Sequence, residues 1–260
     1  PMLRGRSGHW LNLASFAALM AANLAAAALP FGLRRPQQFP HGLHALLTPA
    51  GYTFTIWLII YVLMSGWVLY PLLRANREPF SVTPMPVRFL LTCTLSIVWI
   101  TLGERQPLIS TLVLFLLVFV AASMYHSTRN ILRPSAAEIW FVRLPFSLYF
   151  GWICVTALAS VDALLPHSSI SAATISATSV SAPSHLGLTL LLLAVGILSA
   201  CFVGFRWRDA IVPLTFAWGY GALAAGPQLH QIVAIASSAG SLALIAYALW
   251  IVFLRSHERD

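Results

Sequence analysis

Residues 47–70 read LTPAGYTFTIWLIIYVLMSGWVLY. A Thr-Pro pair and two small residues come first, and an uncharged apolar run follows. Pro49 disfavours helical geometry for Thr48, so a helix is predicted to begin just after this pair. From residue 54 to residue 73 the run would be ~30 Å long as a helix at 1.5 Å per residue, which is enough to cross a bilayer. The stretch therefore predicts a transmembrane helix over 54–73.

The aromatic residues of this run are spaced to share one face of the helix. Trp57 follows Phe54 by three residues and precedes Tyr61 by four, and side chains at these spacings are neighbours on a helix. Lipid does not require an aromatic stripe, so we expect this face to pack inward. The spacing fits aromatic packing between helices as well as it fits the wall of a ligand site.

The composition of the whole chain identifies its broad class. Apolar residues make up 59% of the 260 residues, charged residues make up 8%, and the mean hydropathy is +0.82. A soluble domain of this length could not bury so much apolar surface, so an all-α integral membrane protein is predicted. The net charge of +8 comes from fifteen arginines without any lysine. Because they lie beside apolar runs, these arginines predict topology signals and contacts with anionic lipid headgroups rather than nucleic-acid binding.

The apolar runs predict a bundle of about eight transmembrane helices. The expected ranges are 10–29, 54–73, 87–103, 107–126, 144–165, 186–205, 209–226 and 231–254. The uncharged segment 166–185 is dominated by Ser, Thr and Ala, which is typical of a flexible connection. It would separate a five-helix region, 1–165, from three further helices and a short charged tail, 186–260.

The positions of the arginines support this helix map. With eight spans, twelve of the fifteen arginines fall on one side, and the other side holds only Arg34, Arg35 and Arg105. An excess of arginine marks the side that is not translocated. Both termini are therefore expected on the cytoplasmic or matrix side, in a bacterial inner membrane or a mitochondrial inner membrane.

Three stretches resemble, in order, motifs of the tryptophan-rich sensory protein and translocator protein family, once called peripheral benzodiazepine receptors. The first is 47–70, with pattern residues Thr48, Pro49, Phe54, Trp57 and Tyr61. The second, SIVWITLGERQPLIS, places Trp99 at the tryptophan of the family's third helix. The third, LPFSLYFGWICVTALAS, matches the family's last helix at Pro145, Tyr149 and Trp152.

The resemblance covers residues 10–165, and the later helices would be additional, as in a longer branch of the family. The chain departs from the family pattern at Ala50, Tyr52 and Ser160, where the family has proline, tryptophan and asparagine. The resemblance implies a five-helix membrane bundle that binds tetrapyrroles such as protoporphyrin, or sterols. Transport and porphyrin breakdown have been proposed for the family without an agreed enzymatic mechanism. The resemblance thus implies a receptor or carrier, with a porphyrin or haem as candidate ligand and with bound lipids.

Aromatic residues from three of the predicted helices form the candidate ligand site, namely Trp57, Tyr61, Trp99, Tyr149 and Trp152. Aromatic walls suit a flat apolar macrocycle. The loop before residue 54 would cap the site, and its basic residues could meet propionate groups: Arg34, Arg35, His41 and His44. The same four residues could instead serve topology and loop solubility.

Other chemical patterns in the sequence are thin. No Ser-His-Asp, P-loop or paired-carboxylate pattern occurs, so a conventional hydrolase or pump is not predicted, and the chain is expected not to be an enzyme. The histidine pair in the first loop lacks further ligands for a metal. The three cysteines lie in apolar runs and are predicted to be small buried residues. Asp162 lies near the end of the predicted helix 144–165 and is expected to snorkel or to face the lumen.

A second interpretation is a non-catalytic accessory subunit of a larger membrane complex, such as a respiratory-chain assembly. A scaffold can lose its ligand site and keep its packing. Two small-residue faces are expected to be free for a partner or for a second copy of the chain. They consist of Ala14, Ala18, Ala22 and Ala26 in the first helix and of Ser237, Gly240 and Ser241 in the last. A secondary transporter is a third interpretation, but no inverted repeat or pair of broken helices is evident.

The helix map predicts the outcome of a topology experiment. Tags at the two termini should be protected on the same side of the membrane, because an even number of spans separates them. A tag inserted within 168–182 should be protected on the opposite side. A tag there that shares the side of either terminus would contradict the eight-helix arrangement.

Overall fold

The computed structural model describes residues 2–28, 47, 50–73, 85–102, 106–131, 134–164, 185–226 and 231–257. Within these ranges the chain is helical and has no strand. The long helices are α1 (Met2–Ala28), α2 (Thr55–Leu73), α3 (Pro86–Leu102), α4 (Pro107–Arg129), α6 (Leu144–Leu164), α7 (His185–Trp207), α8 (Ile211–Ala224) and α9 (Gln231–His257). A 3-10 turn, η1 (Gly51–Phe54), leads into α2. The short α5 (Ala136–Glu138) and the π-helical turn η2 (Ile139–Arg143) lead into α6.

Each predicted apolar run corresponds to one of these long helices, which confirms the all-α membrane bundle. In the described ranges, five helical spans of 21 to 29 residues are long and apolar enough to cross a bilayer. The apolar helices α3 and α8 are shorter, with 17 and 14 residues. The main difference lies at the start of the chain, where α1 begins at Met2 rather than at residue 10. Arginine is a good helix former, so Arg4 and Arg6 extend the helix instead of ending it.

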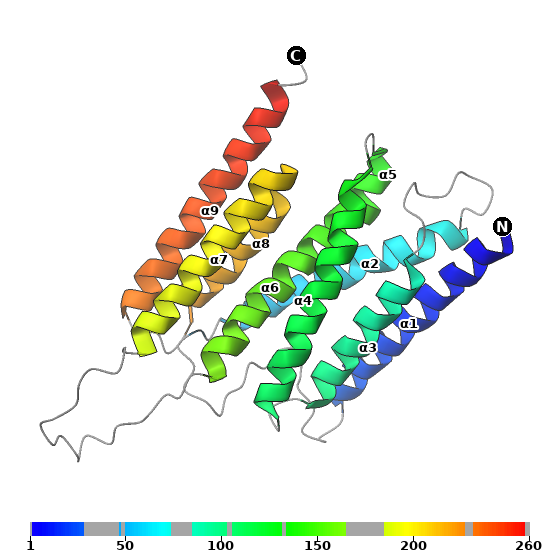
Figure 1. Cartoon of the computed structure of the whole chain (residues 1–260), viewed down its shortest axis with the longest axis horizontal. Helices are drawn as coiled ribbons and strands as arrows, with labels where there is room; N and C mark the ends of the chain where they lie inside the picture. Colours follow the sequence, from blue (N-terminus) through cyan, green and yellow to red (C-terminus); the bar gives the residue numbers. More distant parts are fainter. Residues whose placement is uncertain are drawn as a thin grey trace, which may run out of the picture.

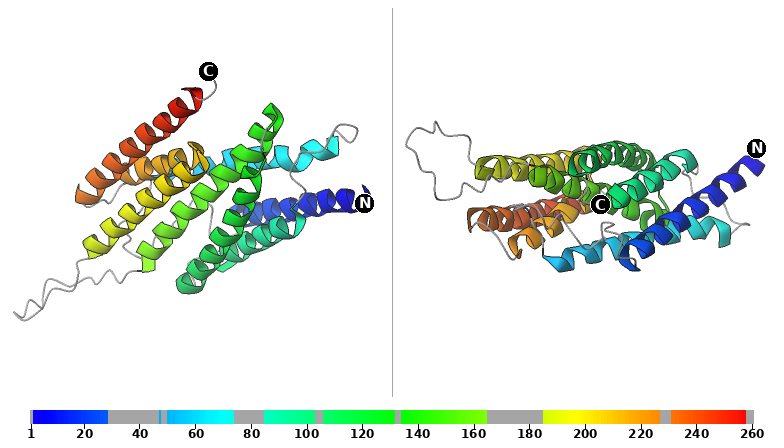
Figure 2. Two further views of the ribbon diagram at one scale, coloured as in Figure 1. Left: turned by 45° about the horizontal axis from the view of Figure 1, so that its top comes forward. Right: turned by 90° about the horizontal axis from the view of Figure 1, so that it is seen from below.

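The long helices run as a tilted bundle in which successive helices alternate in direction (Figure 1). The start of α1 and the end of α9 both lie at the upper ends of their helices in this view (Figure 1). Figure 2 shows α7, α8 and α9 on one side of α6 and α1 and α3 on the other. The alternation brings together the ends that carry Arg88, Arg129, Arg143, Arg206 and Arg208, here called the arginine-rich end.

Helix α6 is the centre of the bundle. Fifteen of its 21 residues are buried, and α2, α4, α7 and α8 all pack against it. Its sequence is apolar on every side, and a helix of that kind is either covered by protein or exposed to lipid. Here protein covers it, so α6 links the first four helices to the last three.

Glycines bring α6 and α8 close together. A Cβ atom added at Gly151 of α6 would lie 3.0 Å from Cβ of Thr215, and one added at Gly219 of α8 would lie 2.8 Å from Cγ1 of Val155. The two contacts are one helical turn apart along both helices. Lipid chains are as apolar as these side chains, so close backbone approach rather than water exclusion holds such helices together.

The small-residue face of the last helix is used inside the molecule. Ser241 Oγ of α9 donates a hydrogen bond to the Ala217 carbonyl oxygen of α8 at 2.8 Å. A Cβ at Gly240 would lie 3.0 Å from Ile197 and Tyr220. The expectation that this face is free for partners is therefore wrong, because α7 and α8 already cover it. On α1, in contrast, Ala14 and Ala18 are exposed and Ala26 is buried.

A buried charge network ties the arginine-rich end together. Arg129 at the end of α4 pairs with Asp209 in the α7–α8 turn at 2.5 Å, and the two side chains are only 7% and 3% exposed. Tyr125 Oη donates to the same carboxyl oxygen at 3.0 Å, and Arg129 also donates to Ser147 Oγ of α6. The other oxygen of Asp209 accepts the backbone N–H of Ile211 at 3.0 Å, at the start of α8. Asp209, which the sequence patterns did not single out, therefore bonds to α4 and α8, and Arg129 extends the network to α6.

The turn before α8 has the backbone geometry of a helix C-terminus. Arg208 has φ of 48°, and the Asp209 N–H donates back to the Gly204 carbonyl oxygen at 3.0 Å. This six-to-one bond with a left-handed residue inside it is the Schellman motif. A left-handed conformation costs a non-glycine residue roughly 1 kcal/mol. The bonds of Asp209 on both sides of the turn offset that cost.

The network predicts a large effect of Asp209→Ala on stability. The substitution leaves Arg129 buried without its countercharge, and breaking a buried pair in this way typically costs about 3–5 kcal/mol. Denaturant unfolding in mild detergent measures the free energy of unfolding of each variant. Arg206→Ala, which removes an exposed arginine of the same end, should cost about 1 kcal/mol or less. Replacing both partners, Arg129→Met with Asp209→Leu, should recover part of the loss. Equal losses in Asp209→Ala and Arg206→Ala would contradict a stabilising role for the pair.

Candidate functional site

The turn before α2 fixes where the aromatic face of that helix begins. Ala50 is extended, with φ −62° and ψ 147°, as expected for a residue just outside a helix. The Thr53 N–H donates to the Ala50 carbonyl oxygen at 3.0 Å, and the Thr53 hydroxyl donates to the same oxygen. Thr53 is fully buried. The chain therefore enters α2 through a tight turn, and Trp57 follows one turn later.

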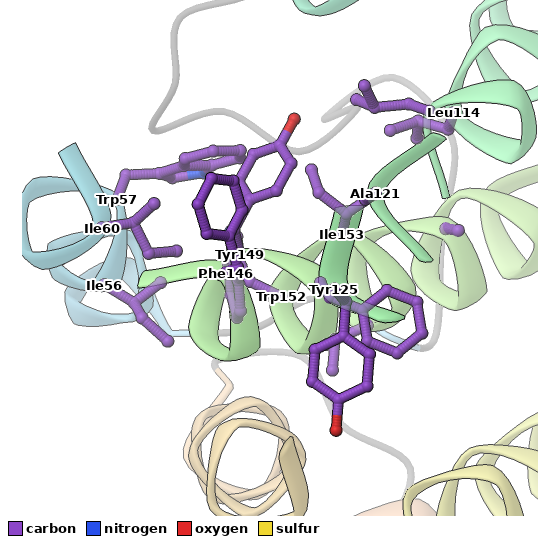
Figure 3. Packing of buried hydrophobic residues seen from close by; sticks show 14 of the residues in the cluster. Ile56, Trp57, Ile60, Leu114, Ala121, Tyr125, Phe146, Tyr149, Trp152 and Ile153 are labelled. Atoms are coloured by element: carbon purple, nitrogen blue, oxygen red, sulfur yellow. The ribbon is translucent and has the colours of Figure 1, made fainter. Parts of the chain in front are cut away.

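Four of the five predicted ligand-site residues form one cluster of rings, here called the ring cluster: Trp57, Tyr61, Tyr149 and Trp152. Trp57 of α2 stacks on Tyr61 of the same helix with centroids 5.4 Å apart. Its ring also meets Tyr149 and Trp152 of α6 edge-on, each at 6.4 Å. Figure 3 shows Trp57 and Tyr149 against each other between α2 and α6. The structure thus brings together residues from the first and third family-like motifs.

The fifth residue, Trp99 of α3, is also buried, with 7% of its surface exposed. Helix α3 reaches the ring cluster through Ser96, whose Oγ lies 3.3 Å from Tyr149 Oη. Trp99 follows Ser96 by three residues, so the two share one face of α3. Cys93 of the same helix is buried as predicted, whereas Cys154 and Cys201 are only partly buried.

Helix α1 contributes to the cluster, which the sequence patterns did not indicate. Phe16 meets Tyr61 edge-on at 6.4 Å and stacks with Phe89 of α3 at the same distance. Asn23 lies near Tyr61, and its amide donates to the Leu19 carbonyl oxygen at 2.9 Å. The ring cluster therefore has aromatic walls and a polar edge of hydroxyl and amide groups.

The indole of Trp152 gives the cluster a further polar group. Trp152 is 1% exposed, and its Nε1 has no hydrogen-bond partner among the residues that the structure describes. Buried indole N–H groups usually find an acceptor. This donor is therefore available to an acceptor atom of a ligand.

The residues predicted to cap the site, Arg34, Arg35, His41 and His44, lie outside the described residues. Two positions at which the chain departs from the family pattern have clear contacts. The Ala50 N–H donates to the Ala222 carbonyl oxygen of α8 at 2.9 Å. Tyr52 meets Trp218 of α8 edge-on at 5.5 Å. Helix α8 thus contacts the segment that begins the first motif.

Asp162 is neither snorkelling nor facing a lumen, so that expectation is wrong. Its side chain is fully buried. One carboxyl oxygen accepts the Leu47 backbone N–H at 2.9 Å, and the other accepts the Thr189 hydroxyl of α7 at 2.6 Å. The acid lies near the end of α6, but α7 and the segment before α2 cover it. It joins three parts of the chain at the end of the bundle opposite the arginine-rich end.

Besides Phe16 of α1, sequence reasoning missed two neighbours of the site on α8, Trp218 and Gly219. The run Trp218-Gly219-Tyr220-Gly221 carried a usable signal, because alternating glycines in an apolar helix permit close helix contact. The partners of Asp162 had no such signal, since Thr189 lies 27 residues away along the chain. Among the described residues, no group of three or more His, Cys, Asp or Glu side chains could hold a metal ion.

Comparison with known proteins gives one match. The sequence profile of a family described as TSPO-like protein matches residues 9–250. No curated protein and no solved structure matches the chain. The matched region extends beyond 165 and includes α7, α8 and most of α9, so the family pattern is not confined to the first five long helices. The chain is an all-α integral membrane protein and belongs to the TSPO-like protein family.

Proposed function

We propose that this TSPO-like membrane protein binds a flat apolar molecule, a tetrapyrrole or a sterol-like compound, at the ring cluster. The observation that carries the proposal is the convergence of Trp57, Tyr149 and Trp152 at ring distances of 6.4 Å across α2 and α6. Tryptophans that only anchor a protein in a bilayer gather at the interfaces instead. These three rings are buried between helices, where a ligand would meet them.

The polar groups around the rings favour a tetrapyrrole over a plain hydrocarbon. The Trp152 N–H is an available donor, and Tyr149 of the same cluster carries a hydroxyl that lies 3.3 Å from Ser96 Oγ. We propose that Arg34, Arg35, His41 and His44 meet the propionates of such a ligand. Rings and hydroxyls without an acid–base pair suit binding better than catalysis, so we propose a receptor or carrier rather than an enzyme.

The exposed arginines suggest the membrane setting of the protein. Arg206 lies over the ring of Trp207 at 5.5 Å, at the arginine-rich end. Arginine and tryptophan together are typical of the headgroup region. We propose that this end contacts anionic lipids and lies on the cytoplasmic or matrix side of a bacterial or mitochondrial inner membrane.

The ligand proposal predicts saturable quenching of tryptophan emission when purified protein is titrated with protoporphyrin. Trp57→Leu should weaken binding about ten- to a hundredfold, since two ring contacts at about 0.5–1.5 kcal/mol each are lost. Trp250→Leu is the matched control, because Trp250 lies on α9 and is 48% exposed. Its affinity should equal that of the unmodified protein. A linear, unsaturable response, or equal quenching in Trp57→Leu, would show partition into detergent and would rule out the ring cluster as the site.

A second candidate function is that of an accessory subunit in a larger membrane complex or a homo-oligomer. The observation that favours it is the exposure of Ala14 and Ala18 on one face of α1. Small residues allow close approach of a partner helix.

The accessory-subunit proposal predicts that Ala14→Leu with Ala18→Leu disrupts association. Native mass measurement of gently extracted protein should show a stoichiometric complex, and the double variant should shift it toward the free chain. Ser238→Leu, on an exposed position of α9, is the control and should leave the complex intact. A free monomer in the unmodified protein would exclude this function.

A further inference from the structure

We propose that Trp218 of α8 is a positioning residue for the ring cluster, and that its contact with the turn before α2 must open to admit a ligand. This inference rests on the proposed ligand site and adds the element that controls it. We call the contact the α8 clasp. It consists of Ala50, Tyr52 and Thr53 on one side and Trp218 and Ala222 on the other.

Three separate interactions make up the α8 clasp. The Ala50 N–H donates to the Ala222 carbonyl oxygen at 2.9 Å. The Trp218 Nε1–H donates to the Thr53 carbonyl oxygen at 3.4 Å, a long and therefore weak bond. The rings of Tyr52 and Trp218 are 5.5 Å apart at 85°. Both rings are partly exposed, at 47% and 41%, whereas Thr53 and Ala222 are buried, so the ring pair is the outer part of the clasp.

Helix α8 acts on both walls of the ring cluster. Trp57 follows Thr53 by one helical turn, so the clasp fixes where Trp57 lies. On the other wall, a Cβ at Gly219 would lie 3.7 Å from Cζ3 of Trp152, so the backbone of α8 supports that ring. Trp218, which contacts the turn before α2, and Gly219, which supports the ring of Trp152, are adjacent in sequence. Helix α8 therefore sets the separation of Trp57 and Trp152.

The rings already touch, and a flat ligand can enter between α2 and α6 only if they separate. The described structure is then the closed state, and the clasp contributes to its stability relative to an open state. A ligand that binds the open state gains apparent affinity when the closed state is weakened. Loss of the clasp should therefore tighten binding, whereas damage to the site would weaken it. A clasp role and a direct role in the site therefore predict changes in ligand affinity of opposite sign.

The first experiment measures protoporphyrin affinity of Trp218→Ala and of Tyr52→Ala. Each removes the edge-on ring pair and should tighten binding about three- to tenfold. The double variant should gain no more than Trp218→Ala alone, because that change already removes both the ring pair and the hydrogen bond to Thr53. Trp250→Ala, at a similarly exposed tryptophan of α9, should leave the affinity unchanged. Unchanged or weaker binding in both clasp variants would overturn the proposal.

The second experiment locks the clasp. Tyr52→Cys with Trp218→Cys, in a protein whose three native cysteines are replaced by serine, can be joined by a short bis-methanethiosulfonate linker. The unlinked protein should bind protoporphyrin more tightly than the parent. The linked protein should bind at least tenfold more slowly, and dithiothreitol should restore the faster rate. Equal binding rates in the linked and unlinked states would mean that ligand does not enter past the clasp.

A readout without ligand separates this proposal from the proposed function. Cys93 is buried on α3, the helix whose Ser96 reaches Tyr149, so its alkylation by N-ethylmaleimide reports opening of this part of the bundle. With Cys154 and Cys201 replaced by serine, Trp218→Ala should speed this reaction about three- to tenfold over Trp250→Ala. Faster alkylation without saturable protoporphyrin binding would contradict the proposed ligand but support the role of the clasp. Alkylation at equal rates in Trp218→Ala and Trp250→Ala would overturn the clasp even if protoporphyrin binds.

Discussion

The packing of protein around all sides of α6 is the constraint on which the rest of the structure depends. A membrane helix gains little from apolar contact with its neighbours, because lipid offers the same contact. It is held instead by close approach and by polar groups that must find partners. Helix α6 supplies both, with Gly151 against Thr215 and with Ser147 and Asp162 bonded to other helices. The helices on either side are placed by these few contacts.

Helix positions and fold class could be predicted because they depend on local properties of the chain. Length, apolar composition and flanking proline or arginine determine where a helix crosses a bilayer. Pro107 begins α4 as predicted, since proline is favoured in a first helical turn. The ring cluster was predictable in part for a related reason. Trp57 and Trp152 each lie in a recognisable motif, and two motifs of one family are expected to meet.

The polar contacts could not be predicted, because each joins residues that are far apart in sequence. Arg129 and Asp209 are separated by 80 positions, and no spacing rule relates them. Asp162 was expected at a water-facing position because an acid is costly among apolar groups. The same cost explains why the buried carboxylate accepts hydrogen bonds from Leu47 and Thr189. The prediction that the small-residue face of α9 is free failed for a different reason. Small residues indicate close packing, but they do not identify the partner helix.

Asp162 and Asp209 both hold the last helices in place, and the difference between these two buried acids follows from their partners. Asp209 pairs with a cation and begins α8, so it fixes that helix at the arginine-rich end. Asp162 accepts two neutral donors, so it holds the start of α7 and the segment before α2 with less electrostatic energy. Away from the arginine-rich end, α8 is bonded to the turn before α2 by the clasp and to α9 through Ser241. Separation at the turn before Trp57 breaks only neutral contacts of the clasp, whereas separation at Asp209 would break a buried ion pair, so opening at the clasp costs less.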